Sequence, residues 1–141
     1  MEKNIVELTV WLHDISSIIY GRKNHHLTGA DIVESKLWEL DYPSGKIETV
    51  KECILCHRGS IEGARISVEA KIFSDADAIA NFNNISGIFL AAFIYEHLSQ
   101  EEAKKPVRER LQRKWNKLKL EQSREMVKPK YEAVMLLLGD Y

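Results

Sequence analysis

The chain has 141 residues and a formal net charge of −1, with 20 lysines and arginines against 21 aspartates and glutamates. This length suits one domain with its own hydrophobic core, and the even charge excludes the basic surface of a general nucleic-acid-binding protein. Hydrophobic residues make up 45% and charged residues 29%, a balance that excludes a disordered or fibrous chain.

Helical periodicity dominates the first part of the chain, and no alternating strand pattern is longer than four residues. Apolar residues at intervals of three and four predict a first helix over residues 5–19, which ends at Gly21. The same spacing predicts a second helix over residues 28–40 and a third over residues 47–57. The first half is therefore expected to be three amphipathic helices joined by short polar loops.

The second part of the chain is also predicted to be helical. A fourth helix covers residues 67–80, and after a short break a strongly apolar fifth helix ends at Leu98. A last, highly charged helix has Pro106 in its first turn and is kinked or broken at Pro129. Its inward-facing residues are expected to be Val107, Leu111, Trp115 and Leu118. The pattern predicts an all-α, single-domain bundle of about six helices over residues 1–141.

No segment has the pattern of a signal peptide or a membrane span. Glu2 and Glu7 interrupt the N-terminal segment, which lacks the apolar run of a secretory signal. The longest apolar run, residues 85–95, is much shorter than the roughly 20 residues that cross a bilayer. The two cysteines suit a reducing compartment. We therefore expect a cytoplasmic protein with no membrane and no nucleic-acid polymer among its partners.

Imidazole and carboxylate groups occur together at the start of the chain. His13 and Asp14 are adjacent on the first predicted helix, and this pair suits Mn, Fe, Ni, Co, Zn or Mg in a mixed nitrogen and oxygen site. His25 and His26 precede the second helix and, taken alone, resemble solvent-exposed loop residues. His57 continues the apolar stripe of the third helix, so it is expected to face the core.

The Asp75-Ala76-Asp77 segment is the most unusual feature of the sequence. Both carboxylates lie on apolar stripes in the middle of the fourth predicted helix, where aspartate has poor helix propensity. Burying a carboxylate costs several kcal/mol unless it is paired or coordinated. Asp75 and Asp77 are therefore expected to have partners, or to lie on a helix that is less buried than the pattern indicates.

A rival pattern, C-x-x-C-H, runs from Cys53 to His57 and matches the haem c attachment motif. That chemistry needs an oxidising compartment, whereas this motif lies inside an amphipathic helix. A thioredoxin-like pair needs a βαβ unit, and a zinc knuckle needs two more ligands. Cys53 and Cys56 are therefore interpreted as small helix residues, at least one of them buried.

In their order along the chain, these groups resemble the HD superfamily of metal-dependent phosphohydrolases. The segment WLHDI around His13 and Asp14 resembles the His-Asp doublet of that family. Residues 69–79, EAKIFSDADAI, resemble the later segment that supplies an aspartate ligand, here Asp77. The resemblance implies that these three side chains hold a divalent cation: Mn, Fe, Ni, Co, Zn or Mg.

Two further histidines occur in contexts that many members of the family share. His26 lies in HLTGA and His57 in ILCH, and such histidines bind a second metal or the substrate phosphate. The resemblance covers roughly residues 5–98. It implies a metal-site core within residues 1–98 and a long charged helix and tail over residues 101–141.

The activity implied by the resemblance is hydrolysis of a nucleotide or another small phosphorylated metabolite, in which a metal-activated water attacks phosphorus. Asp14 and Asp75 are the expected catalytic carboxylates, with Asp75 accepting a proton or orienting a ligand histidine. Three basic residues beside the histidines would meet the phosphate charge or remain ordinary surface cations: Arg22, Lys23 and Arg58.

Two other functions stay open. Family members carry a further metal-binding histidine upstream of the doublet, and none of the twelve residues before His13 is a histidine. A degenerate HD-fold module, which binds metal or nucleotide weakly without efficient turnover, is the alternative. A partner-binding all-α domain that uses the charged last helix would show neither metal nor turnover. A small phosphorylated substrate is the expected partner, and assembly as a homodimer is left open.

Overall fold

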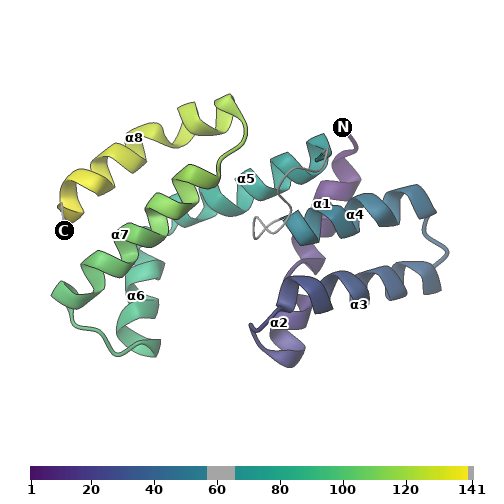
Figure 1. Ribbon diagram of the computed structural model, residues 1–141, viewed down its shortest axis with the longest axis horizontal. Coiled ribbons are helices and arrows are strands. Elements are labelled where there is room, and N and C mark those ends of the chain that lie inside the picture. Colours follow the sequence, from purple (N-terminus) through teal and green to yellow (C-terminus); the bar gives the residue numbers. More distant parts are fainter. Residues whose placement is uncertain (57–65, 140–141) are drawn as a thin grey trace. The chain divides into compact units, whose positions relative to one another are not determined.

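The computed structural model describes residues 1–56 and 66–139, and these form eight helices and no strand (Figure 1). The all-α prediction is confirmed. The helices are α1 (Lys3–Leu12), α2 (Ile15–Tyr20), α3 (His25–Glu39), α4 (Ser44–Cys56), α5 (Val68–Asn83), α6 (Ile85–Tyr95), α7 (Gln100–Lys117) and α8 (Glu121–Leu138).

The chain divides into two compact units, Met1–Ser74 and Asp75–Tyr141, and α5 runs through the boundary. The first unit contains α1 to α4 and the beginning of α5. The second contains the rest of α5 and α6 to α8. The expectation of a single domain over residues 1–141 stays a prediction.

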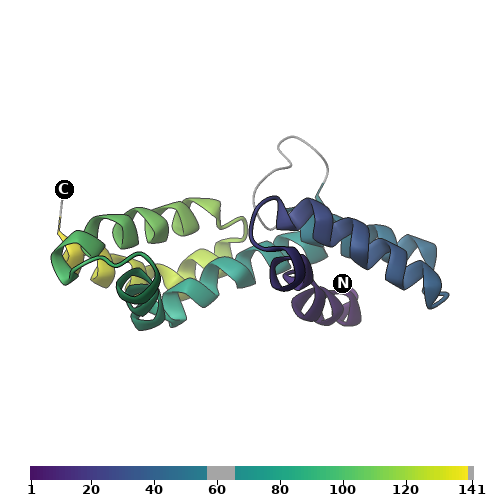
Figure 2. The ribbon, with the colours of Figure 1, turned by 90° about the horizontal axis from the view of Figure 1, so that it is seen from below.

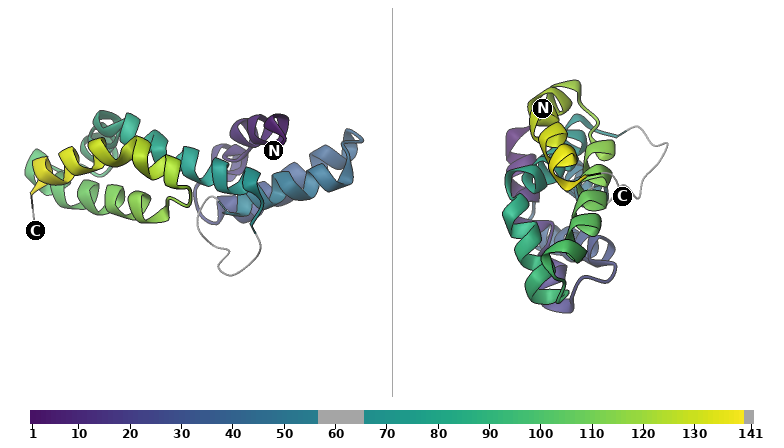
Figure 3. Two further views of the ribbon diagram at one scale, coloured as in Figure 1. Left: turned by 90° about the horizontal axis from the view of Figure 1, so that it is seen from above. Right: turned by 90° about the vertical axis from the view of Figure 1, so that its left-hand side faces the viewer.

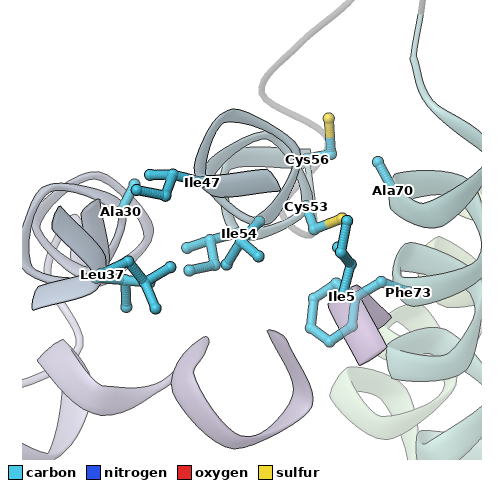
Figure 4. Close-up of a cluster of buried hydrophobic side chains, with 11 residues drawn as sticks. Ile5, Ala30, Leu37, Ile47, Cys53, Ile54, Cys56, Ala70 and Phe73 are labelled. Carbon is cyan, nitrogen blue, oxygen red and sulfur yellow. The ribbon is translucent and has the colours of Figure 1, made fainter. Parts of the chain in front are cut away.

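In the first unit, α3 and α4 form an antiparallel hairpin, with α2 packed on α3 and α1 packed on α4 (Figures 1 and 2). The predicted stripe of α4 is confirmed, because Ile47, Val50 and Ile54 are fully buried in the core. Ile5 of α1 and Phe73 of α5 lie beside this stripe (Figure 4). Apolar burial of this kind is the main stabilising contribution to a helical unit of this size.

The first expected helix, residues 5–19, is divided into α1 and α2 at His13 and Asp14. In an uninterrupted helix, the Val10 carbonyl would accept a hydrogen bond from the N–H of Asp14. Here the Nδ1 atom of the His13 ring lies 2.9 Å from that carbonyl oxygen. The backbone of Asp14 leaves helical geometry at φ −102° and ψ 8°. A local side-chain contact therefore accompanies the break, which the apolar spacing could not indicate.

In the second unit, α7 and α8 lie side by side, and α6 packs on α7 (Figure 3). Val107, Leu111 and Leu118 are buried, as the sequence predicts, and Trp115 is partly buried in the same cluster. The Trp115 ring stacks on Tyr131 of α8 with centroids 4.5 Å apart and planes 6° from parallel. Aromatic stacking and apolar burial together hold the two helices.

The charged last helix is divided at residues 118–120, and the expectation of a kink or break at Pro129 was wrong. Pro129 lies inside α8, and Pro106 lies inside α7 beyond its first turn. Leu118 turns to an extended conformation at φ −59° and ψ 128°. The position of the break depends on a contact with Asp75, described below.

The apolar run of residues 85–95 forms α6, and a single residue, Asn84, separates it from α5. The Asn84 side chain caps α6 by accepting a hydrogen bond of 3.2 Å from the N–H of Gly87. In the described ranges, no single helix is long and apolar enough to cross a membrane. Within those ranges, one pair, α5 and α6 bent by 76°, meets that test of length and composition.

The packing around Gly29 shows how closely α3 approaches the break between α1 and α2. A Cβ atom at Gly29 would lie 3.5 Å from the His13 carbonyl oxygen and 3.5 Å from the Ser16 Cβ, which are ordinary contact distances. Alanine is more favourable than glycine inside a helix by about 0.5–1 kcal/mol. We expect Gly29→Ala to raise the free energy of unfolding by about that amount, measured by urea denaturation.

Gly29→Leu is the matched control, since a longer side chain has no room between α3 and the break. We expect it to lower the free energy of unfolding by about 1–3 kcal/mol. Equal stability of the alanine and leucine variants would contradict the close packing at Gly29.

Candidate functional site

The Asp14 carboxylate lies between two imidazole rings in the first unit. Its Oδ2 is 3.2 Å from Nε2 of His13, and its Oδ1 is 3.4 Å from Nε2 of His25. The His25 side chain is buried and His13 is 23% exposed, whereas Asp14 is 53% exposed. Two nitrogens and a carboxylate therefore face one another at a point that solvent can reach.

The other nitrogen of each ring, Nδ1, lies within hydrogen-bond distance of a backbone carbonyl oxygen. Nδ1 of His13 is 2.9 Å from the Val10 oxygen, and Nδ1 of His25 is 2.8 Å from the Arg22 oxygen. A carbonyl can only accept, so each Nδ1 is assigned the proton and each Nε2 is left to face Asp14. Metal-ligating histidines are oriented in this way, with the outer N–H donated to an oxygen.

The chemistry of this donor set fits a divalent cation. Imidazole nitrogens and a carboxylate are ligand types that suit a divalent cation in a mixed nitrogen and oxygen site. The distances of 3.2 and 3.4 Å between the Asp14 oxygens and the two Nε2 atoms are direct contacts between the side chains. Within residues 1–56 and 66–139, no group of three His, Cys, Asp or Glu side chains is placed to hold a metal ion.

His25 is the member of this cluster that sequence reasoning missed. The predicted loop residue begins α3, whose expected start was Thr28. Gly21 at φ 86° and Asn24 at φ 53° adopt left-handed conformations, and they reverse the chain between α2 and α3. The available signal for this turn in the sequence was the pair Gly21 and Asn24, two residue types that tolerate positive φ, three positions apart.

His26, the residue predicted from the family pattern, is also buried. Its ring centroid is 6.0 Å from that of His25, with the ring planes 81° apart. Its role as a ligand stays a prediction. Arg22 and Lys23 are exposed, and the Arg22 carbonyl is the group that orients His25. His57 and Arg58, also predicted for the site, lie outside the described residues.

Phe73 connects the beginning of α5 to the His-Asp doublet within the first unit. Its ring centroid lies 5.2 Å from that of His13 in an edge-on arrangement. An edge-on ring contact of this kind is favourable beyond the apolar area that it buries. Phe73 and Asp77 are four residues apart, so they share one face of α5.

Asp77, in the second unit, is paired with two lysines of α7. Its Oδ2 lies 2.7 Å from Nζ of Lys114 and 3.5 Å from Nζ of Lys117. All three side chains are mostly buried. Burial lowers the pKa of Lys117, and the neighbouring Lys114 adds to this effect, whereas Asp77 opposes it. Lysines thus supply the partner that a carboxylate on an apolar stripe requires.

Asp75 is almost fully buried and binds backbone amides of the same unit. Its Oδ1 accepts a hydrogen bond of 2.8 Å from the N–H of Lys119, and its Oδ2 accepts one of 2.9 Å from the N–H of Leu120. These amides immediately precede α8, so Asp75 fixes the break between α7 and α8. Both oxygens are used structurally, and nothing in these contacts favours the catalytic role predicted for Asp75.

Cys53 and Cys56 are buried thiols in α4, in agreement with the interpretation from sequence. Burial raises the pKa of the Cys53 thiol to about 12. A thiol of this kind is neutral at physiological pH and is a poor nucleophile. The C-x-x-C segment is therefore part of the core packing.

Comparison with known sequences places these features in a family. The family model for the HD domain matches residues 1–81. The chain belongs to the HD domain family. No curated protein and no solved structure matches it. The matched part of this HD protein contains His13, Asp14 and His25, and it ends within α5 after Asp75 and Asp77.

Removing the Asp75 carboxylate tests its structural role. Asp75→Ala leaves two amide groups without their charged acceptor, and a buried hydrogen bond to a charged group is worth about 1.5–3 kcal/mol. We expect the free energy of unfolding to fall by about 3 kcal/mol, measured by urea denaturation. Asp31→Ala, at an exposed helical position, is the control and should change it by less than about 0.5 kcal/mol. Equal effects at the two positions would show that Asp75 does not hold the start of α8.

The thiol of Cys53 gives an independent test of burial. In a Cys56→Ala variant, alkylation of Cys53 at pH 8 should be on the order of 100-fold slower in the folded protein than in urea. The raised pKa leaves little thiolate at this pH, and the core excludes the reagent. Mass spectrometry follows the reaction, and equal rates in both conditions would contradict the burial of Cys53.

Proposed function

We propose that this HD protein is a metal-dependent phosphohydrolase that acts on a nucleotide or another small phosphorylated metabolite. The observation that carries the proposal is the cluster of His13, Asp14 and His25, in which backbone carbonyls orient both rings toward the carboxylate. Membership of the HD family supports the general class, which is metal-dependent hydrolysis of phosphate compounds.

In the proposed site, His13, Asp14 and Asp77 hold a divalent cation, which is Mn, Fe, Ni, Co, Zn or Mg. When bound, such an ion polarises a phosphate group and lowers the pKa of a coordinated water. The chain's own part is to keep each ring in the correct orientation, through the Val10 and Arg22 carbonyls. We add His25 to the proposed ligands, because its Nε2 faces the same carboxylate as that of His13.

Other roles rest on the family pattern alone. His26 and His57 are proposed to bind a second ion or the substrate phosphate. Arg22, Lys23 and Arg58 are proposed to meet phosphate charge, and Asp75 to act in proton transfer. For Asp75, the two backbone hydrogen bonds support a structural role better than this one.

A degenerate HD module is the second candidate, and one observation favours it. Asp77 already has a lysine ammonium 2.7 Å from one oxygen, so a metal must displace that lysine before Asp77 can coordinate it. Competition of this kind lowers the affinity for the metal. A module of this type would bind metal or nucleotide weakly and turn over slowly.

We propose the cytoplasm as the location and a small phosphorylated compound as the partner, with no membrane and no nucleic-acid polymer. Two buried thiols in the core support a reducing compartment. The near-zero net charge supports the absence of a surface that binds nucleic acid. Assembly as a homodimer is left open and can be tested by sedimentation.

Metal analysis of the purified chain tests the proposal. After equilibrium dialysis against Mn²⁺ or Ni²⁺, we expect about one ion per chain, because three or four protein ligands suffice for a stable site. Asp14→Asn and Asp77→Asn should each weaken binding by at least about tenfold, and so should His25→Gln. Asp31→Asn, at an exposed helical position, should not change it.

Phosphate release from a panel of nucleotides and sugar phosphates separates the two candidates. Metal-dependent turnover that disappears in Asp14→Asn supports the hydrolase. A chain that binds metal and releases no phosphate from any of these compounds is the degenerate module. A chain that stays free of metal after dialysis against both ions would sink the hydrolase proposal.

A further inference from the structure

Two lysines of α7 converge on one carboxylate oxygen in the second unit. Lys114 and Lys117 are three residues apart, so they lie on the same face of the helix. Their Nζ atoms lie 2.7 and 3.5 Å from Oδ2 of Asp77. The lysine side chains are 23% and 16% exposed, so their stems are largely buried and place the ammonium groups at a defined point.

Two ammonium groups meet a single carboxylate at this point. The Asp77 carboxylate carries one negative charge for the two lysines. Asp75, two residues earlier, directs its two oxygens to the amides of Lys119 and Leu120 and not to these lysines. A single lysine would suffice as a counter-ion for Asp77. A second lysine at the same oxygen gives a pair of converging ammonium groups, an arrangement that suits an anion.

The surroundings hold this pair in place. Leu111 and Leu118 are buried on either side of it, so α7 is fixed along the stretch that carries both lysines. Asp75 fixes the residues immediately after α7 through the backbone. On α5, the Asn81 side chain donates a hydrogen bond of 2.8 Å to the Asp77 carbonyl oxygen. Only the flexible ends of the two lysines need to move for their partner to change.

We propose that Lys114 and Lys117 form a phosphate-binding pair, which Asp77 holds in place when no phosphate is bound. Two ammonium groups match the charge of a phosphate dianion and supply up to six N–H donors. The inference rests on the proposed function for the second role of Asp77, that of a metal ligand. The anion is the phosphate group of the substrate or free inorganic phosphate.

The shared carboxylate makes the two binding events favour each other. A cation on Asp77 repels the two ammonium groups from Oδ2, and they become available to phosphate oxygens. Phosphate, in turn, removes the lysines from Asp77 and leaves its carboxylate available to the cation. By thermodynamic linkage, each ligand raises the affinity for the other by the same factor.

Titration calorimetry on the full chain tests the inference, with inorganic phosphate and MnCl₂ as the probes, separately and together. In the wild type, we expect each ligand to tighten the other about 5- to 150-fold, the usual range of coupling between sites. In Lys114→Met/Lys117→Met, phosphate binding without Mn²⁺ should weaken at least about tenfold. Mn²⁺ binding without phosphate should become tighter, because Oδ2 no longer holds ammonium groups.

Two control variants separate phosphate binding from a general loss of charge or fold. Lys105→Met removes an exposed lysine from the same helix and should leave both affinities unchanged. Lys114→Arg keeps a donor group at the position and should retain most of the phosphate affinity. If the double variant does not fold, as judged by circular dichroism, Lys114→Gln and Lys117→Gln are measured singly, and each should weaken phosphate binding.

The outcomes also distinguish this inference from the proposed function. If the lysine variants bind phosphate as the wild type does, the inference is overturned, whatever the metal result. If the wild type binds no Mn²⁺ but the lysine variants lose phosphate, the binding pair is supported and the metal-dependent function fails. If Lys105→Met weakens phosphate binding as much as the double variant does, the effect is general charge attraction and the pair is rejected.

Discussion

The first unit is organised by a hydrogen bond between an imidazole ring and the backbone. Nδ1 of His13 lies at hydrogen-bond distance from the Val10 carbonyl oxygen, and α1 ends at this point. The next helix, α2, begins directly after Asp14. Because the break places His13 and Asp14 at a junction, both side chains can face the same point, which adjacent residues on one regular helix do not do. The short α2 and the turn before α3 then bring His25 to the opposite oxygen of Asp14. The position of His25 therefore depends on the local break at the doublet.

Asp75 and Asp77, separated by one residue on α5, offset the cost of burying a carboxylate through different kinds of partner. Asp75 is almost fully buried and binds two backbone amides, which cannot leave without unwinding the junction before α8. Asp77 is paired with lysine side chains, which can turn away at the cost of a few rotamer changes. A carboxylate that holds backbone is a structural anchor, whereas one that holds mobile cations can exchange its partner. The D-A-D segment thus combines stability with an exchangeable charge.

The sequence was sufficient for the fold class and for the core, because apolar spacing reports the buried face of each helix. Ile47, Val50 and Ile54 show this directly. The two helix breaks could not be found in this way. At His13 a side chain takes a helical carbonyl, and before α8 Asp75 binds amides more than forty residues away. Neither contact changes the apolar period, and the prolines suggested other positions. The doublet was recognised from its residue types, but His25 was missed because its role depends on the turn geometry between α2 and α3.

The lysines on Asp77 bear on the stability of this HD protein. A buried, unpaired carboxylate would destabilise the empty protein by several kcal/mol, and the ammonium groups offset most of that cost. Under the proposed function, the same contact would have to be broken for a cation to bind Asp77, so the stability that it provides would lower the apparent affinity for the metal. Structural zinc sites follow the opposite course, since their ligands have no other partner and the empty chain unfolds. Lys114 and Lys117 therefore suit the proposed function, in which the protein would remain folded while metal and phosphate bind and leave.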